Sequence, residues 1–208
     1  MQTLLKIVSF LLVLACLLFN MMEAARAADK TVDKSNLTIL GLVIGDCTSP
    51  DIYSKLGPGI PFKDEANPNF TQLCYVSDKD DTLILFSFKN SQCTRFKLMS
   101  QKIRFYKWHF CEKSPLVSKH LATGSGTKLG MSKRRLKAIL GTPRHESDEN
   151  MEYVYEWIQK RNTLETERGS QDLRNAKGTP HRKLKTIIRV EFSDAKLISF
   201  DVLKYSQY

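Results

Sequence analysis

One segment of the chain occurs twice, and this repeat restricts the folds that the sequence can adopt. The stretch IGDCTSPDIYSKLGPG, residues 44–59, matches LGMSKRRLKAILGTP, residues 129–143. Each copy places a hydroxyl residue, Thr48 or Ser132, where the N-cap of a helix belongs. Each copy then ends in Leu-Gly with a proline nearby, because glycine suits the position just past a helix and proline prevents its continuation. We therefore predict two short helices of the same pattern.

Each predicted helix is followed by three segments rich in β-branched and aromatic residues, which is typical of strands. The segments are QLCYVS, TLILFSF and RFKLMSQ in the first copy, and MEYVYEW, TIIRVEF and KLISFDVL in the second. Alternation places Ile188, Val190 and Phe192 on one face of the second middle strand, and it leaves Arg189 and Glu191 exposed on the other. In the first copy it groups three apolar residues: Ile84, Phe86 and Phe88. We expect an α+β fold of two tandem units, each a short helical segment packed on an antiparallel three- to four-stranded meander.

The N-terminal segment has the features of a secretory signal peptide. Its apolar run, residues 7–19, follows Lys6 and is shorter than the roughly 20 residues that span a bilayer. Small residues at Ala25 and Ala27 form a cleavage pattern. We predict a signal peptide at residues 1–27, an N-terminal linker at 28–34, a first repeat at 35–112 and a second repeat at 113–208. The alternatives are an uncleaved membrane anchor and lipid attachment at Cys16.

The cysteines that follow the signal peptide indicate disulfides, because an even number in an exported chain is typical of a disulfide framework. The four are Cys47, Cys74, Cys93 and Cys111, and counting alone leaves three pairings open. Cys93 and Cys111 flank two strand-like stretches centred on Lys102, and a hairpin there would place them opposite each other. We therefore predict Cys93–Cys111 and Cys47–Cys74. The chain has no C-x-x-C pair and its histidines are scattered, so we expect no structural metal site.

The second copy, from LGMSKRRLKAILGTP through the strand YVYEW and the two strands after it, resembles the SmpA/OmlA (BamE-like) domain family. The tandem duplication is similar to that of the β-lactamase inhibitory protein family. The resemblance implies an α+β fold in the bacterial cell envelope and a role in binding rather than catalysis. Members support outer-membrane protein assembly, contact anionic lipid or, in the tandem form, grip an enzyme. The duplication and the four cysteines depart from the BamE pattern.

A long basic connection separates the first two strands of the second repeat, at residues 159–185, where the first repeat has only SDKDD. Long connections in compact domains are often functional or disordered. This one carries eight basic and three acidic side chains in a chain whose net charge is +10. A basic residue near an anionic membrane contributes about 1 kcal/mol. The candidate binding residues are Lys160, Arg161, Arg168, Arg174, Lys177, Arg182, Lys183 and Lys185.

From these observations we predict a non-catalytic, exported protein-binding module of the bacterial cell envelope, periplasmic or associated with the outer membrane and linked to its assembly or maintenance. One alternative is a binder of anionic lipid or polyanions through the basic loop, and another is a proteinaceous enzyme inhibitor. We expect an envelope protein as partner, and no cofactor, nucleic acid or small-molecule substrate. Turn and capping chemistry explains four aspartates better than catalysis does: Asp46, Asp51, Asp80 and Asp81.

Overall fold

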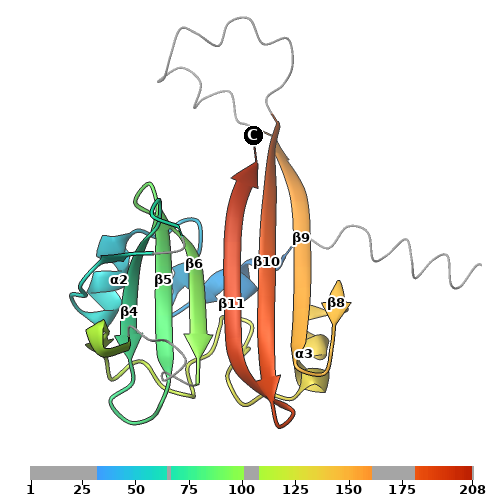
Figure 1. Ribbon diagram of the computed structural model, residues 1–208. Coiled ribbons are helices and arrows are strands. Elements are labelled where there is room, and N and C mark those ends of the chain that lie inside the picture. The colour runs from blue at the N-terminus through green and yellow to red at the C-terminus, as the bar shows by residue number, and fades with distance from the viewer. Residues whose placement is uncertain (1–31, 65–66, 101–107, 161–180, 208) are drawn as a thin grey trace, which may run out of the picture. The chain divides into compact units, whose positions relative to one another are not determined.

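A computed structural model describes residues 32–64, 67–100, 108–160 and 181–207, and the chain from Val32 to Tyr208 forms one compact unit. The predicted signal peptide and Cys16 lie outside the described residues. The described residues of this unit have an α+β fold, in which two α-helices, α2 (Ser49–Leu56) and α3 (Lys133–Leu140), accompany a mostly antiparallel sheet (Figure 1).

The main sheet of the described residues has nine strands in the order β3-β4-β5-β6-β11-β10-β9-β8, with β7 beside β4. Their bounds are β3 (Phe62–Lys63), β4 (Thr71–Val76), β5 (Leu83–Lys89), β6 (Gln92–Met99), β7 (Glu112–Lys113), β8 (His145–Glu146), β9 (Asn150–Lys160), β10 (His181–Ser193) and β11 (Lys196–Gln207). Strands β6 and β11 pair antiparallel from Met99↔Ser199 to Arg95↔Leu203. The strands of both predicted repeats therefore share one sheet, and the boundary between residues 112 and 113 stays a prediction.

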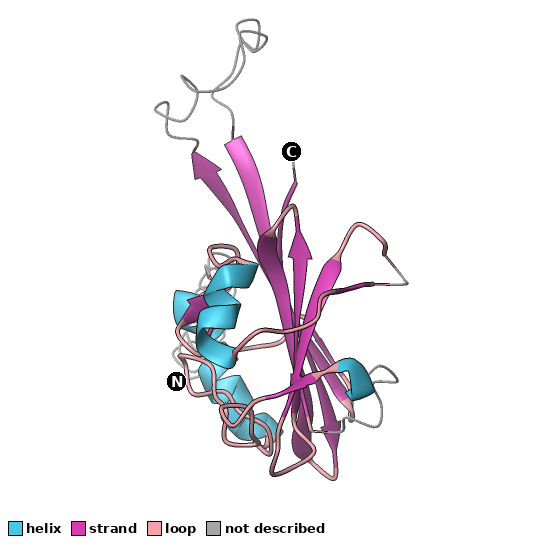
Figure 2. Ribbon diagram, turned by 90° about the vertical axis from the view of Figure 1, so that its left-hand side faces the viewer, coloured by secondary structure: helices cyan, strands magenta, loops and turns pink. Residues whose placement is uncertain are grey.

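A small N-terminal element precedes α2. It consists of the 3₁₀ helix η1 (Lys34–Leu37) and the antiparallel strands β1 (Thr38–Ile39) and β2 (Leu42–Val43). Together with α2 and α3 it lies on one face of the main sheet, whereas the 3₁₀ helix η3 (Trp108–Phe110) lies on the other (Figure 2). We call these the helix-covered face and the open face.

The core lies between the helices and the helix-covered face. Leu136 and Leu140 of α3 are buried in the same cluster as Ile52 and Leu56 of α2. The strands contribute the residues that alternation grouped together: Ile84, Phe86, Phe88, Ile188, Val190 and Phe192. Because each set recurs every second residue along a strand, the predicted inward faces of both middle strands are confirmed.

Both predicted helix caps are confirmed. The Asp51 carboxylate accepts hydrogen bonds from the Thr48 amide at 2.8 Å and the Thr48 hydroxyl at 2.7 Å, which closes the first turn of α2. The Ser132 hydroxyl accepts from the Arg135 amide at 3.4 Å at the start of α3. Gly57 and Gly141 end the helices at φ values of 90° and 84°, where a side chain would be strained.

The second of the two strand-like stretches predicted between Cys93 and Cys111 is wrong over its last part, because Trp108–Phe110 forms η3 instead. Strand β6 pairs with β5 on one side and with β11 on the other. Both of its edges are therefore occupied, and the predicted hairpin centred on Lys102 has no place in the sheet. Residues 101–107 lie outside the described residues.

Candidate functional site

Strand β4 lies near one end of the main sheet. One of its edges pairs with β5, and two short strands pair with the other edge. Strand β3 pairs with its first residues, and β7 runs parallel to its last residues, Tyr75 and Val76. The Tyr75 hydroxyl donates to the Gly57 carbonyl at 2.8 Å, and the Ser114 amide donates to the Val76 carbonyl at 2.9 Å. These bonds hold the segment before β3 and the segment after β7 against β4.

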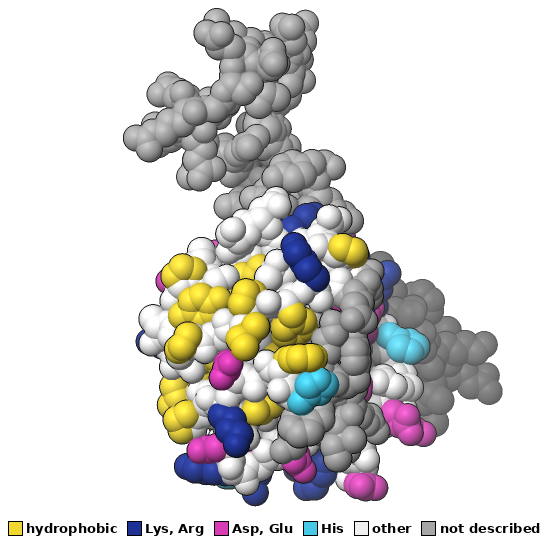
Figure 3. Space-filling view, turned by 60° about the vertical axis from the view of Figure 1, so that its left-hand side comes forward, with side chains coloured by type: hydrophobic (Ala, Val, Ile, Leu, Met, Phe, Trp, Pro, Cys, Tyr) yellow, Lys and Arg dark blue, Asp and Glu magenta, His cyan; other side chains and the backbone are white. Residues whose placement is uncertain are grey.

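Both segments, together with η3, present large apolar side chains to solvent. Ile60 is 61% exposed, Phe110 is 55% exposed and Leu116 is 51% exposed. Figure 3 shows hydrophobic side chains gathered on the side of the molecule that carries α2 and β4. We call six exposed residues of these segments the β4-edge patch: Pro58, Ile60, Pro61, Phe110, Pro115 and Leu116. Exposed apolar side chains gathered on one side of a soluble protein are typical of interaction sites.

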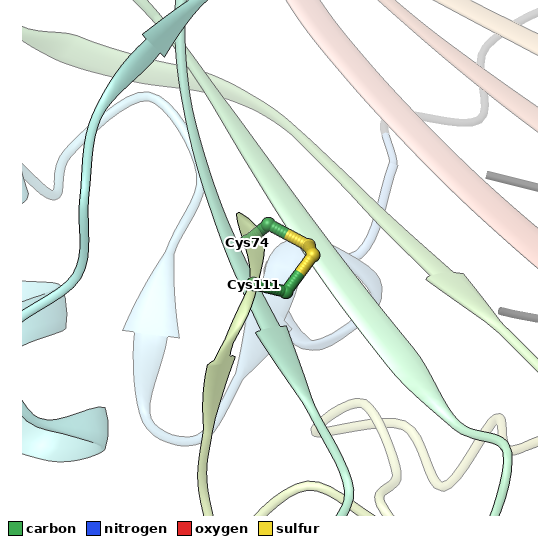
Figure 4. Close-up of a disulfide and its surroundings, with 2 residues drawn as sticks. All are labelled: Cys74 and Cys111. Carbon is green, nitrogen blue, oxygen red and sulfur yellow. A yellow bond between two sulfur atoms is a disulfide. The ribbon is translucent and has the colours of Figure 1, made fainter. Parts of the chain in front are cut away.

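A disulfide fixes the backbone beside the β4-edge patch. Cys74 of β4 is bonded to Cys111, with a Cα–Cα distance of 4.7 Å (Figure 4). On the open face Cys74 belongs to a small apolar cluster with Val76, Leu83, Leu85 and Met99, against which Cys111 packs. Because Cys111 directly follows Phe110, the crosslink restrains the position of that exposed ring.

The Cys74–Cys111 disulfide shows that both predicted pairings, Cys93–Cys111 and Cys47–Cys74, are wrong. The physical reason is the alternation of side chains across the sheet. Cys74 lies on the open face, whereas Cys47 and Cys93 are buried in the core of the helix-covered face. The parallel pairing of β7 with β4 brings Cys111 beside Cys74, and it cannot be read from the spacing of cysteines along the chain.

The open face of strands β6, β11, β10 and β9 is lined with ion pairs. Arg95 of β6 binds Asp201 of β11 through two hydrogen bonds of 2.7 Å, and these side chains are 30% and 9% exposed. The other pairs are Lys97–Glu191 at 3.5 Å, Lys183–Glu156 at 2.8 Å, Lys185–Glu156 at 3.1 Å and Arg189–Glu152 at 2.9 Å. These described pairs combine five basic with four acidic side chains, so the surface they form is close to neutral.

The electrostatics of these pairs follow from their hydrogen bonds. The bond to Asp201 raises the pKa of Arg95, although burial opposes this shift. The bonds from Lys183 and Lys185 lower the pKa of Glu156, which keeps that carboxylate charged over the whole neutral range. Exposed pairs contribute about 0–1 kcal/mol each, so among the described pairs the loss of one partner should cost most at the largely buried, doubly bonded Arg95–Asp201 pair.

The predicted basic loop, residues 159–185, includes the ends of two strands and a range that the structure does not describe. Strands β9 and β10 pair as far as Lys160 and His181, so the regular hairpin extends into the range 159–185. Lys183 and Lys185 are therefore strand residues, and both are paired with Glu156. Lys160 and Arg182 are also strand residues, but their side chains lie outside the described ones. Four of the predicted binding residues fall in the range 161–180, which the structure does not describe: Arg161, Arg168, Arg174 and Lys177.

Sequence reasoning missed the β4-edge patch and the Arg95–Asp201 pair. Ile60 and Leu116 look like core residues in the sequence, and only the placement of their segments at β4 shows that they are exposed. For the ion pair a signal existed, because Arg95 directly precedes Phe96 and Asp201 stands between Phe200 and Val202, so both alternate with apolar residues. Side chains at such positions face the polar side of a sheet.

The aspartates considered for catalysis include two with structural roles. Asp51 caps α2, and the Asp80 carboxylate accepts hydrogen bonds from the Thr82 amide at 2.9 Å and the Lys119 amide at 3.0 Å. Burial raises the pKa of Asp80, but the bonds from Lys119 and Thr82 outweigh it and lower the pKa to about 2. Asp80 thereby joins the turn between β4 and β5 to the segment that follows the patch.

Replacing Asp80 with asparagine is expected to change the acid dependence of stability. The pKa of Asp80 is about 2 when folded and about 4 when unfolded. The contribution of the ionised Asp80 carboxylate to the free energy of unfolding is therefore complete above about pH 4 and is lost as pH falls through about 2. The gap in urea midpoint between wild type and Asp80→Asn should shrink across this window. The exposed neighbour Asp78→Asn serves as control, and a gap that stays constant from about pH 7 to about pH 2.5 would contradict the assignment.

A shallow pocket of about 280 Å³ lies at the turn between β10 and β11, and its lining includes Glu149, Glu191 and Asp194. Within the part of the chain that the structure describes, no group of three or more His, Cys, Asp or Glu side chains is placed to hold a metal ion. None of the described helices is long and apolar enough to cross a membrane.

The fold and the surfaces define a class: an α+β protein with a helix-covered face, an open face lined with ion pairs and an exposed apolar patch at the β4 edge. Comparison with protein-family models, curated proteins and solved structures finds no match for this chain.

Proposed function

We propose that this chain is a tandem BamE-like, non-catalytic binding module of the bacterial cell envelope, which holds a protein partner at the β4-edge patch. The order of elements supports the tandem relationship, since α2 precedes the meander β4–β6 and α3 precedes the meander β9–β11. Both helices begin at a hydroxyl residue, end at a glycine and lie on the same face of the sheet. The exposed apolar side chains of the patch carry the binding proposal.

Burial of these side chains would drive association with a protein. Moving a Leu, Ile or Phe side chain from water into an apolar contact contributes about 1.5–3 kcal/mol, so Ile60, Phe110 and Leu116 are suitable anchors. The Cys74–Cys111 disulfide and the hydrogen bond from Tyr75 to Gly57 hold the anchoring segments in place before binding. A preorganised surface loses less entropy on association, which favours a specific partner with a complementary apolar surface.

The charges of the described residues favour the binding of a protein partner over the binding of anionic lipid. Lys183 and Lys185 share Glu156, so these two predicted lipid contacts are already engaged. The described ion pairs of the open face combine five basic with four acidic side chains, and a nearly neutral group of charges gains little from an anionic membrane. Anionic-lipid binding through the remaining basic residues is the alternative, and inhibition of an enzyme is the special case in which the partner is that enzyme.

Site-specific crosslinking tests the proposal. A photo-activated amino acid at position 116 of the full chain, expressed in its own cells, should crosslink one protein in near-stoichiometric yield. The double variant Ile60→Asp/Phe110→Asp, which carries the same photo-activated residue at position 116, should recover that protein at least about tenfold less well, because two apolar anchors are lost. Ala138→Asp, which adds a charge on the exposed side of α3, is the matched control and should leave recovery unchanged.

Other results would contradict the proposal. If position 116 yields no protein adduct, or Ala138→Asp lowers recovery as much as the patch variant, the patch is not the binding site. A crosslinked product of this chain with itself would identify a second copy as the occupant. Flotation with phosphatidylglycerol vesicles at low salt, together with the absence of a protein adduct, would establish the lipid alternative instead.

A further inference from the structure

Among the described residues, two cysteines lie outside the Cys74–Cys111 disulfide, Cys47 and Cys93, and they lie opposite each other. Thr48 and Gln92 form an antiparallel bridge between the segment before α2 and the start of β6. Cys47 directly precedes Thr48 and Cys93 directly follows Gln92, and the Cys93 amide donates a hydrogen bond to the Cys47 carbonyl at 2.9 Å. Antiparallel pairing therefore places Cys47 directly across from Cys93.

This placement matches the geometry of a disulfide. Directly opposed residues of an antiparallel pair have Cα atoms about 4.5–5.5 Å apart, and disulfides join Cα atoms roughly 4.4–6.8 Å apart. The Cys47 and Cys93 side chains are 5% and 0% exposed and belong to the same core cluster, so they point to the same side. A hydrogen bond between the two thiols lowers the pKa of Cys47 and raises that of Cys93, which is consistent with direct contact.

We propose that Cys47 and Cys93 form a second disulfide, which clamps the start of α2 to β6 on the helix-covered face. With Cys74–Cys111, this gives one crosslink on each face of the sheet. The arrangement is the third of the pairings that four cysteines allow. It also gives a role to the two buried cysteines that lie outside Cys74–Cys111 among the described residues.

Oxidation requires a disulfide-bearing oxidant, such as an envelope dithiol oxidase or, in vitro, oxidised glutathione. The Cys47 thiolate attacks one sulfur of the oxidant and forms a mixed disulfide, and the first oxidant thiolate leaves. The Cys93 thiolate then attacks the Cys47 Sγ and releases the second. The two cysteine protons end on the two oxidant thiols, so the oxidant gains the two electrons that the cysteine pair loses. Because both side chains are buried, the bond forms while the chain folds.

Peptide mapping under non-reducing conditions tests the proposal. The full chain is isolated from its own cells into N-ethylmaleimide with denaturant, so that every free thiol is trapped. We expect linked peptides that contain Cys47 with Cys93 and Cys74 with Cys111, and no maleimide on any of the four. Maleimide on both Cys47 and Cys93, or a link from either to Cys74 or Cys111, would overturn the proposal.

Two double variants separate the crosslinks. Cys74→Ala/Cys111→Ala should retain the Cys47–Cys93 link, and Cys47→Ala/Cys93→Ala should retain only the other. The urea midpoint of wild type should fall on reduction further than that of Cys47→Ala/Cys93→Ala, because wild type has two bonds to lose. Equal shifts would contradict a second bond. The non-reducing peptide map of wild type shows whether Cys47 and Cys93 are bonded, even if a variant does not fold.

Discussion

Replacing Phe200 with alanine is expected to lower the free energy of unfolding by about 3–5 kcal/mol. Phe200 is 1% exposed and lies on β11 opposite Leu98 of β6, where the two meanders meet. Its ring centroid is 6.0 Å from that of Phe96. Removing the ring leaves a cavity in the core of the junction, where strands from both sides would have to move to fill it.

Urea unfolding monitored by circular dichroism measures this loss. Phe200→Leu is the matched control, because it keeps most of the apolar volume and should cost well under half as much. A loss below about 1 kcal/mol in Phe200→Ala would mean that the junction is not tightly packed. We also expect a single transition in each variant, because the strands of both meanders belong to one compact unit.

Replacing Asp201 with alanine is expected to lower the free energy of unfolding by about 3 kcal/mol. The change leaves the guanidinium of Arg95 half-buried without the two hydrogen bonds of 2.7 Å that satisfy it. Such an unpaired charge costs more than the intact pair contributes. Equilibrium unfolding at low and high salt is the measurement, and the loss should change little with salt because the pair is shielded from solvent.

Two comparisons test the cause. Arg95→Met/Asp201→Leu removes both charges and should recover most of the lost stability, since apolar residues replace a buried pair well. Glu152→Ala removes a partner of Arg189, whose side chain is 55% exposed, and should cost about 0.5 kcal/mol or less. If Asp201→Ala costs no more than Glu152→Ala, the pair does not stabilise the junction.

The parts of the fold that local chemistry specifies could be predicted from the sequence. Thr48 and Ser132 cap the helices as expected, because a cap depends on residues three positions away. Alternation placed Ile188 and Val190 in the core, because period two is a property of any strand. These features need no knowledge of distant residues.

Features that depend on pairing between distant segments could not be predicted. The Cys74–Cys111 disulfide depends on β7 running parallel to β4, a contact that the cysteine spacing does not encode. The ends of β9 and β10 are rich in polar residues and therefore resemble a loop, although they pair as a hairpin. The β4-edge patch was missed for the same reason. Ile60 and Leu116 are residue types that usually lie in a core, but here they are exposed to solvent.

The pairing of β6 with β11 has a consequence for the order of assembly. Arg95 and Asp201, which this pairing brings together, are 106 residues apart in sequence. Until β11 pairs with it, one edge of β6 has unpaired N–H and C=O groups that another unfolded chain could engage. Contacts of such long sequence separation form slowly, so we expect the arrival of β11 to be a late step in folding. Until then a chaperone that covers exposed strand edges would protect this protein from aggregation.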